Sequence, residues 1–380
     1  MRRASDADRA RLNGTFADLC RIESPSGHER ACADRVTEEL RGLGLAVEED
    51  DAGAVVGADA GNLLARLPGP GPESILLCAH LDTVPPLAPI DPVIVDGGWE
   101  NAAEGILGAD NKAAVAVLLE LARRFAAGGE EPPIGVELLF TVSEENGLRG
   151  AQAFDTSRLS SKFGYVFDHA SPIGGIVVAA PTYDQIVAVM HGRAAHAGIR
   201  PEQGRSAILA AARAIAAMRL GRVDEETTAN VGTIVGGTAT NVVPERCRLE
   251  AEVRGLDNAR VAELVTEMVD HLHDAANATE CDLDVTVERQ FQGYRSKPSA
   301  PQIVAATRAL QACGYEPHHL VTGGGSDANA FQAAGLPCAN LADGTERNHE
   351  PGERVSIDAL EGMLEVSIAL LDAAAEATRA

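Results

Sequence analysis

The feature that most constrains the fold of this chain is a change in its apolar pattern midway along it. In the first part, short apolar runs at 74–80, 135–142 and 165–170 alternate with longer stretches of helical spacing at 29–44 and 111–129. Short apolar runs of this kind are typical of buried strands. Strands that alternate with helices favour an α/β sheet covered by helices on both faces.

The segment that follows has another order of elements. Residues 183–297 predict a strand, a helix, two strands, a helix and a strand, which is the order of the ferredoxin-like split motif. From about residue 299 the α/β pattern of alternating strands and helices returns, and the last predicted element is a helix from Ile357. We therefore predict a discontinuous α/β domain of residues 1–182 and 298–380, with a mixed sheet between helices, interrupted by a small α+β domain of residues 183–297. A chain of 380 residues with 45% hydrophobic content is long enough for two cores.

Charge and cysteine usage exclude several classes of partner. A formal net charge of -24 repels phosphate backbones and anionic membrane surfaces. No run approaches eighteen unbroken apolar residues, and the N-terminal stretch lacks an apolar signal segment. The seven cysteines are scattered without CxxC pairs, as in proteins of a reducing compartment. We expect a cytoplasmic protein that binds neither nucleic acid nor membrane.

Histidines and acidic residues follow several of the predicted strands, where open α/β sheets build their sites. Each has an ordinary explanation on its own, because a histidine after a strand can be structural and an Asp that opens a helix can be a cap. Together they favour a two-metal hydrolase, which needs two imidazoles and several carboxylates around ions ~3.5–4 Å apart. The residues are His80, Asp82, Asp110, Glu144, Glu145, Asp168 and His349.

The adjacent carboxylates Glu144 and Glu145 are consistent with a two-metal hydrolase, because consecutive side chains point in different directions and can have different roles. One can bind a metal while its neighbour faces a metal-bound water as general base. Asp82 is two residues past His80 on the same strand face, so it can accept a hydrogen bond from the imidazole nitrogen that binds no metal. Without metal these carboxylates would repel one another, so metal loss should lower stability.

In this order and spacing, the motifs resemble those of the co-catalytic zinc exopeptidases and deacylases, which include peptidase T, glutamate carboxypeptidase, aminoacylase and acetylornithine deacetylase. The resemblance covers nearly the whole chain. The matching segments are HLDTVPP (80–86), LGADNKAA (107–114), SEENGLRGA (143–151), the Asp of FDHA, HAG (196–198), GGGSD (323–327) and the late His349.

The resemblance implies a role for each residue of the metal centre. His80 and Asp168 would hold one zinc, Glu145 and His349 the other, and Asp110 would bridge them and precede a cis peptide bond. Glu144 would be the general base. Two Zn²⁺ ions per subunit are expected, although Co²⁺ or Mn²⁺ would also suit mixed oxygen and nitrogen ligands.

The resemblance also makes the inserted domain a lid through which the chain forms a homodimer. His196 would reach an active site, often the partner subunit's, to steady the oxyanion. Asn241 and Arg254 match positions that contact substrate, and Arg254 could clamp a terminal carboxylate. Gly325 and Ser326 could present amides to a substrate carboxylate. Simpler explanations exist for some of them. His196 could be a histidine in a turn, Arg254 a surface charge, and the 323–327 segment a turn without a role in binding.

Within this family, an Asp at the position of Asp168 is typical of aminopeptidase-type members. The sequences of the SEENG and GGGSD motifs resemble the peptidase T branch most. We therefore expect an aminopeptidase that acts on short peptides. The alternatives are a metal-dependent carboxypeptidase or N-acyl-amino-acid deacylase, and a non-catalytic family member. A complete set of five ligands together with Glu144 argues against the last alternative.

Overall fold

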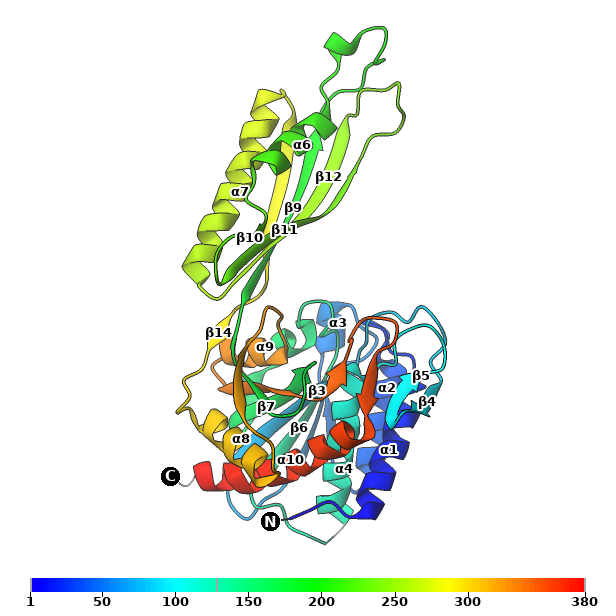
Figure 1. Cartoon of the computed structure of the whole chain (residues 1–380), viewed down its shortest axis with the longest axis vertical. Helices are drawn as coiled ribbons and strands as arrows, with labels where there is room; N and C mark the ends of the chain where they lie inside the picture. The colour runs from blue at the N-terminus through cyan, green and yellow to red at the C-terminus, as the bar shows by residue number, and fades with distance from the viewer. Residues whose placement is uncertain (1, 128, 379–380) are drawn as a thin grey trace. The chain divides into compact units, whose positions relative to one another are not determined.

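The computed structural model describes residues 2–127 and 129–378 and divides the chain into two compact units (Figure 1). The first unit combines Met1–Ala179 with Arg295–Ala380, and the second is Ala180–Tyr294. The first has α/β architecture and the second is an inserted α+β unit, as the order of elements in the sequence predicts. Within the described residues, no helix combines the length with the apolar character that crossing a bilayer requires.

The first unit is built on a nine-stranded mixed sheet of order β1-β2-β6-β3-β7-β16-β8-β14, with β15 paired to β8. The strands are β1 (Val47–Glu49), β2 (Leu63–Leu67), β3 (Ser74–His80), β6 (Gly135–Thr141), β7 (Ser161–His169), β8 (Gly175–Ala180), β14 (Tyr294–Arg295), β15 (His318–Val321) and β16 (Cys338–Ala342). Strand β3 is parallel to both β6 and β7, and β7 is parallel to β16. The carboxyl ends of these four strands therefore meet at one edge of the sheet.

Helices enclose this sheet and create its core. Strands β3 and β6 are buried along their whole length, which explains their unbroken apolar runs. Helices α1, α4, α8 and α10 pack together, with α4 against β3 and α8 against β7, whereas α9 contacts β7 and β16. The helices are α1 (Asp6–Cys20), α2 (Arg30–Gly42), α3 (Ala52–Val56), α4 (Ala109–Ala127), α5 (Arg149–Ala153), α8 (Pro301–Ala312), α9 (Asp327–Ala333), α10 (Ile357–Ala377) and the 3-10 turn η1 (Thr156–Arg158).

A second, small sheet in the same unit was not expected from the sequence. It has the order β17-β18-β5-β4 and consists of β4 (Pro92–Val95), β5 (Gly98–Asn101), β17 (Thr345–Glu346) and β18 (Arg354–Ser356). These strands are only two to four residues long and show no clean alternation of buried and exposed positions. The sheet anchors both ends of the loop that carries His349, because that loop joins β17 to β18.

The inserted unit has a five-stranded antiparallel sheet of order β10-β11-β12-β9-β13. Burial alternates strictly along β9, so one face is covered and the other is partly exposed. The covered face packs against two helices around a core that includes Ile186, Leu249, Leu264 and Met268. Its elements are β9 (Thr182–His191), η2 (Pro201–Gln203), α6 (Ala207–Ala217), β10 (Gly221–Arg222), β11 (Thr227–Gly236), β12 (Arg246–Gly255), α7 (Asn258–Ala278) and β13 (Asp282–Phe291).

Candidate metal centre

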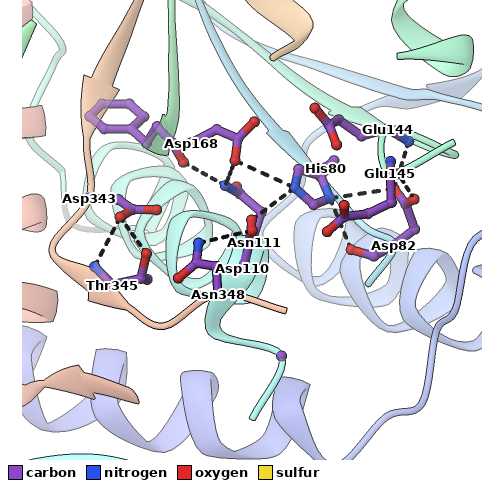
Figure 2. A network of polar contacts seen from close by, with 12 residues as sticks. His80, Asp82, Asp110, Asn111, Glu144, Glu145, Asp168, Asp343, Thr345 and Asn348 are labelled. Atoms are coloured by element: carbon purple, nitrogen blue, oxygen red, sulfur yellow. Dashed lines mark hydrogen bonds and ion pairs between the residues drawn. The ribbon is translucent and has the colours of Figure 1, made fainter. Parts of the chain in front are cut away.

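The five candidate ligands gather where the parallel strands of the large sheet end. Figure 2 labels all of them except His349. His80 is the last residue of β3, Asp168 is next to last in β7, and Glu145 follows β6. Asp110 is the second residue of α4, and His349 lies in the loop between β17 and β18. Residues that are far apart in the sequence thus meet because parallel strands share an edge.

These side chains form two triads that share one carboxylate. His80, Asp110 and Asp168 form the first triad, and Asp110, Glu145 and His349 form the second. In each triad the ligand atoms all lie within 4.8 Å of one another. Such a shared carboxylate is what a pair of closely spaced metal ions requires.

The distances show how Asp110 divides its two oxygens. Its Oδ1 is 3.1 Å from His80 Nε2, which also lies 3.8 Å from Asp168 Oδ1. Its Oδ2 is 3.2 Å from His349 Nε2, which lies 2.9 Å from Glu145 Oε1. Metal–ligand bonds of about 2.0–2.2 Å place neighbouring atoms of a tetrahedral shell roughly 3.3–3.6 Å apart. The nitrogen and oxygen donors present therefore fit two divalent cations.

The two histidines are strongly biased toward their charged form. Burial lowers the pKa of His80, but its hydrogen bonds with Asp110 and Asp168 outweigh burial and raise that pKa well above its usual value. Hydrogen bonds with Asp110 and Glu145 raise the pKa of His349 to about 10. The acidic groups around each imidazole therefore attract a positive charge, which a metal ion can supply in place of the proton.

Asp168, Glu144 and Glu145 are biased toward their neutral form, because the pKa of each carboxyl group is raised. Burial, with the charge of Asp110, raises the pKa of Asp168 to about 8. Burial, with the charge of Asp168, raises the pKa of Glu144 well above its usual value. Burial also raises the pKa of Glu145, although its hydrogen bond with His349 opposes that shift. Crowding of this kind is relieved by cations, and it is common at functional sites.

Asp82 holds the turn that carries the adjacent glutamates. Its Oδ1 accepts a hydrogen bond from the backbone N–H of Glu144 at 3.0 Å, and its Oδ2 accepts one from that of Glu145 at 3.1 Å. His80 Nδ1 lies closer to the backbone oxygen of Asp82, at 2.9 Å, than to its Oδ1, at 3.4 Å. Asp82 is thus the partner of the imidazole, as expected, but mainly through its backbone carbonyl. This contact leaves Nε2 to face the cluster.

Several residues that the sequence reasoning missed support this site. Glu29 accepts hydrogen bonds from the backbone N–H and hydroxyl of Ser143, directly before the two glutamates. Asn348 donates from its amide to Asp110 Oδ2 at 2.9 Å. Glu353 accepts from the backbone of Asp110 at 2.9 Å. The sequence carries no local signal for these contacts, since each joins distant segments.

The start of α4 has an unusual backbone, as the resemblance implies. The peptide bond between Asp110 and Asn111 is cis, and neither residue has helical dihedral angles. The buried amide of Asn111 donates to the Phe167 carbonyl at 2.6 Å and faces Asp168 Oδ1 at 3.5 Å. Asn111 thereby links the segment of the shared carboxylate to the strand that carries Asp168.

The inserted unit brings together two of the three residues predicted there. His196 and Val242 form an isolated antiparallel bridge, and the N–H of Ala197 donates to the Asn241 carbonyl at 2.9 Å. His196 and Asn241 are therefore neighbours, and both are exposed.

Arg254 lies elsewhere in the inserted unit. In the pairing of β12 with β9, Arg254 faces Tyr183 whereas Arg246 faces His191, at the end of the strand nearer His196. Eight residues at about 3.3 Å each place these two ends roughly 26 Å apart. The guanidinium stacks 4.4 Å from the Tyr183 ring centroid and pairs with Glu252 at 3.1 Å.

The glycine-rich turn at 323–327 leads into α9 in the first unit. Ser326 is the N-cap of this helix and is buried, and its N–H donates to Asn329 Oδ1 at 3.2 Å. Gly325 precedes it and is partly exposed. The capping geometry accounts for Ser326 in the fold, so its predicted contact with substrate, like that of Gly325, stays a prediction.

Two family models match separate parts of the chain. The model of the peptidase dimerisation domain matches residues 184–280, within the inserted unit. The model of peptidase family M28 matches residues 62–171, the stretch that contains His80, Asp110, Glu145 and Asp168. One segment of the chain therefore resembles a peptidase, and another resembles a peptidase dimerisation domain.

Comparisons over the whole chain agree with this result. The chain is 36% identical over 367 residues to the uncharacterized protein YqjE of Bacillus subtilis strain 168, which covers 96% of this chain and 99% of that protein. It is 38% identical to the crystal structure of aminopeptidase PepT from Bacillus cereus ATCC 10987, with a TM-score of 0.87 and coverage of 97% and 99%. A tripeptidase structure from Staphylococcus aureus subsp. aureus Mu50 is 33% identical, with a TM-score of 0.90 and the same coverage. The chain therefore belongs to the peptidase T-like metallopeptidases, a metal-dependent branch of the co-catalytic exopeptidase and deacylase family.

Proposed function

We propose that this protein is a two-metal aminopeptidase that removes the N-terminal residue from short peptides. The metal ions are zinc, or cobalt or manganese in its place. His80 and Asp168 would hold one ion, Glu145 and His349 would hold the other, and both would share Asp110. The observation that carries the proposal is the division of the Asp110 oxygens between two histidine-containing triads.

When bound, the metal pair polarises the scissile carbonyl and lowers the pKa of the attacking water. The chain's own contribution centres on Glu144, whose carboxylate is nine-tenths buried and lies within a cluster with His80 and Glu145. Glu144 accepts the proton of the attacking water and delivers it to the leaving amine. Asp82 keeps this carboxylate in place by holding the backbone N–H groups of the turn.

The charge of the site favours a substrate with a free amino terminus. Figure 2 shows the carboxylates of Asp82, Asp110, Glu144, Glu145, Asp168 and Asp343 in one network. Two divalent cations would bring four positive charges, so the ionised carboxylates would outnumber them and would attract a further cation, such as a peptide ammonium group. The names of the aminopeptidase and tripeptidase relatives support the same substrate class.

We also propose that the chain forms a homodimer through the inserted unit. Strand β10 pairs only with Thr228 and Ala229, so among the described residues the outer edge of β11 has no strand partner from 231 to 236. Ile234 and Val235 on this stretch are 48% and 72% exposed. An unpaired strand edge that carries apolar side chains favours pairing with another chain. In such a dimer, His196 supplies a hydrogen bond to the oxyanion in the partner's site.

The first test compares one unblocked tripeptide with its N-acetylated twin, using protein loaded with zinc. We expect cleavage of the free-amine peptide alone. Glu144→Ala serves as the blank, because residual cleavage in that variant would reveal a contaminating peptidase. Faster cleavage of the N-acetylated tripeptide would instead support a carboxypeptidase or an N-acyl-amino-acid deacylase. Cleavage of neither peptide by fully metallated protein would contradict the aminopeptidase assignment.

A further inference from the structure

Glu353 is a buried carboxylate close to the metal centre that has no place among the ligands or the base. It is 1% exposed and lies four residues after His349, directly before β18. Burial of an ionised carboxylate is costly unless strong hydrogen bonds compensate it. Its partners therefore indicate why this position is charged.

All of those hydrogen bonds reach a single segment, the one that leads into α4. Glu353 Oε2 accepts from the backbone N–H of Leu107 at 2.8 Å and of Gly108 at 2.9 Å. Its Oε1 accepts from the backbone N–H of Asp110 at 2.9 Å. Backbone N–H groups at the start of a helix lack intrahelical acceptors, and charge-assisted bonds to a carboxylate are stronger than neutral ones.

The same contacts connect two of the three segments that supply the second triad. One segment carries Asp110, and the other carries His349 and ends at Glu353. Between them, the N–H of Gly352 also donates to the Gly105 carbonyl at 3.4 Å. A shift of either segment would change the separation between Asp110 Oδ2 and His349 Nε2, which is 3.2 Å. Metal sites tolerate errors of only about 0.2 Å in ligand placement.

We propose that Glu353 is a positioning residue that keeps the bridging Asp110 and His349 in register for the metal pair. This inference rests on the proposed two-metal function. Glu353 touches neither the substrate nor the metals; it acts through the backbone of the 107–110 segment. It therefore sets how tightly the metals bind, and how well the bridged pair is formed, in addition to stabilising the fold.

The test uses Glu353→Gln, which keeps the shape of the side chain. An amide has one acceptor oxygen and an NH₂ group that cannot accept, so at least one backbone N–H loses its partner. Zinc affinity is measured by competition with a chromophoric chelator. Melting temperature is measured in excess chelator and again in saturating zinc, because the difference reports metal binding to the folded state.

Glu137→Gln is the matched control. Glu137 is 2% exposed, and its Oε2 accepts from the backbone N–H groups of Ser160 and Ser161, both at 2.9 Å. It is the third residue of β6, at the end of that strand opposite the metal centre. The control thus also removes a buried carboxylate that holds backbone N–H groups.

We expect Glu353→Gln to lower zinc affinity roughly 10–100-fold, the usual effect of changing a residue that orients ligands. Its zinc-dependent gain in melting temperature should shrink, and kcat at saturating zinc should fall more than KM rises. Glu137→Gln should lower the melting temperature in chelator and leave zinc affinity unchanged. Wild-type zinc affinity in Glu353→Gln would overturn the inference and make Glu353 structural only.

A second variant, Glu353→Asp, covers the case in which the glutamine variant does not fold. It keeps the charge, but its shorter side chain cannot reach all three N–H groups, so zinc affinity should fall between the wild type and Glu353→Gln. Zinc affinity equal to the wild type in a folded Asp variant would overturn the inference. If the wild-type protein takes up none of zinc, cobalt or manganese, the proposed function fails, and this inference fails with it.

Discussion

Two buried glutamates at opposite ends of one strand show how differently this protein uses the same side chain. Glu137 lies near the start of β6, where its carboxylate accepts hydrogen bonds from Ser160 and Ser161 and pairs with Arg66 at 3.2 Å. Glu144 lies just beyond the end of β6, where burial and the charge of Asp168 raise its pKa well above the usual value. Burial is similar at both positions, and the neighbours differ.

The difference separates a structural carboxylate from one suited to chemistry. Donors surround Glu137, so its negative charge is compensated within the fold. Glu144 is buried and crowded by other carboxylates, and the nearby His80 compensates its charge only in part. A carboxylate whose pKa is raised holds a proton more readily than an ordinary one, as a general base must.

The sharpest way to test this contrast is Glu144→Gln. The amide cannot accept a proton, so kcat/KM should fall by about 10²–10⁴-fold. Metal content should stay at the wild-type level, because Glu144 is not among the proposed ligands. The melting temperature in chelator should be equal to the wild type or higher, since one repelling charge is removed. Activity within tenfold of the wild type would remove Glu144 as the base.

Asp110→Asn breaks the centre at its shared ligand. The variant weakens both triads at once, because the two Asp110 oxygens face His80 and His349 separately. The loss of zinc affinity should exceed the roughly 10–100-fold typical of residues that only orient ligands. Metal analysis after gel filtration measures the bound zinc per chain. Retention of two equivalents would contradict the bridging assignment.

Glu137→Gln tests the structural member of the pair. Weakened or unpaired contacts with Ser160 and Ser161 should lower the free energy of unfolding by about 1–3 kcal/mol. Peptidase activity at saturating zinc should remain at the wild-type level, because the substitution lies at the far end of β6 from the site. Urea denaturation measures the first quantity and initial rates the second. A large loss of activity in the folded variant would mean that the contrast between the two glutamates is wrong.

Ser26→Ala should have the smallest effect. The Ser26 hydroxyl donates to Asp82 Oδ2 at 2.7 Å, and Asp82 keeps its two backbone donors when that hydroxyl is removed. Loss of one hydrogen bond should cost about 0.5–1.5 kcal/mol, seen as a few-fold decrease in kcat or a small decrease in melting temperature. A loss of activity as large as that of Glu144→Gln would show that Asp82 depends on Ser26 alone.

Much of the fold could be predicted because its signals are local. Fully buried strands read as unbroken apolar runs, and the order of elements in the inserted unit follows from the alternation of short and long patterns. The small sheet of β4, β5, β17 and β18 was missed for a physical reason. Strands of two to four residues are specified by pairing with distant partners, and their own residues show no period.

The candidate site was only partly predictable from the sequence. His80 and Asp168 end strands, so their positions in the sequence already point to a common edge. Glu353 and Asn348 gave no such signal, since their contacts with the Asp110 segment span 238–246 residues of sequence. Arg254 was predicted to contact substrate, and the structure gives it Glu252 and Tyr183 as neighbours. Its role, like that of His196, stays a prediction.

The position of the inserted unit in the chain has a consequence for how the protein is made. Four of the proposed ligands lie before the insertion, and His349 lies after it, about 180 residues beyond Asp168. At roughly 5–20 residues per second, a ribosome takes on the order of 10–35 s to cover that distance. Until then the proposed set of ligands is incomplete, so the proposed metal pair can form only late in biosynthesis.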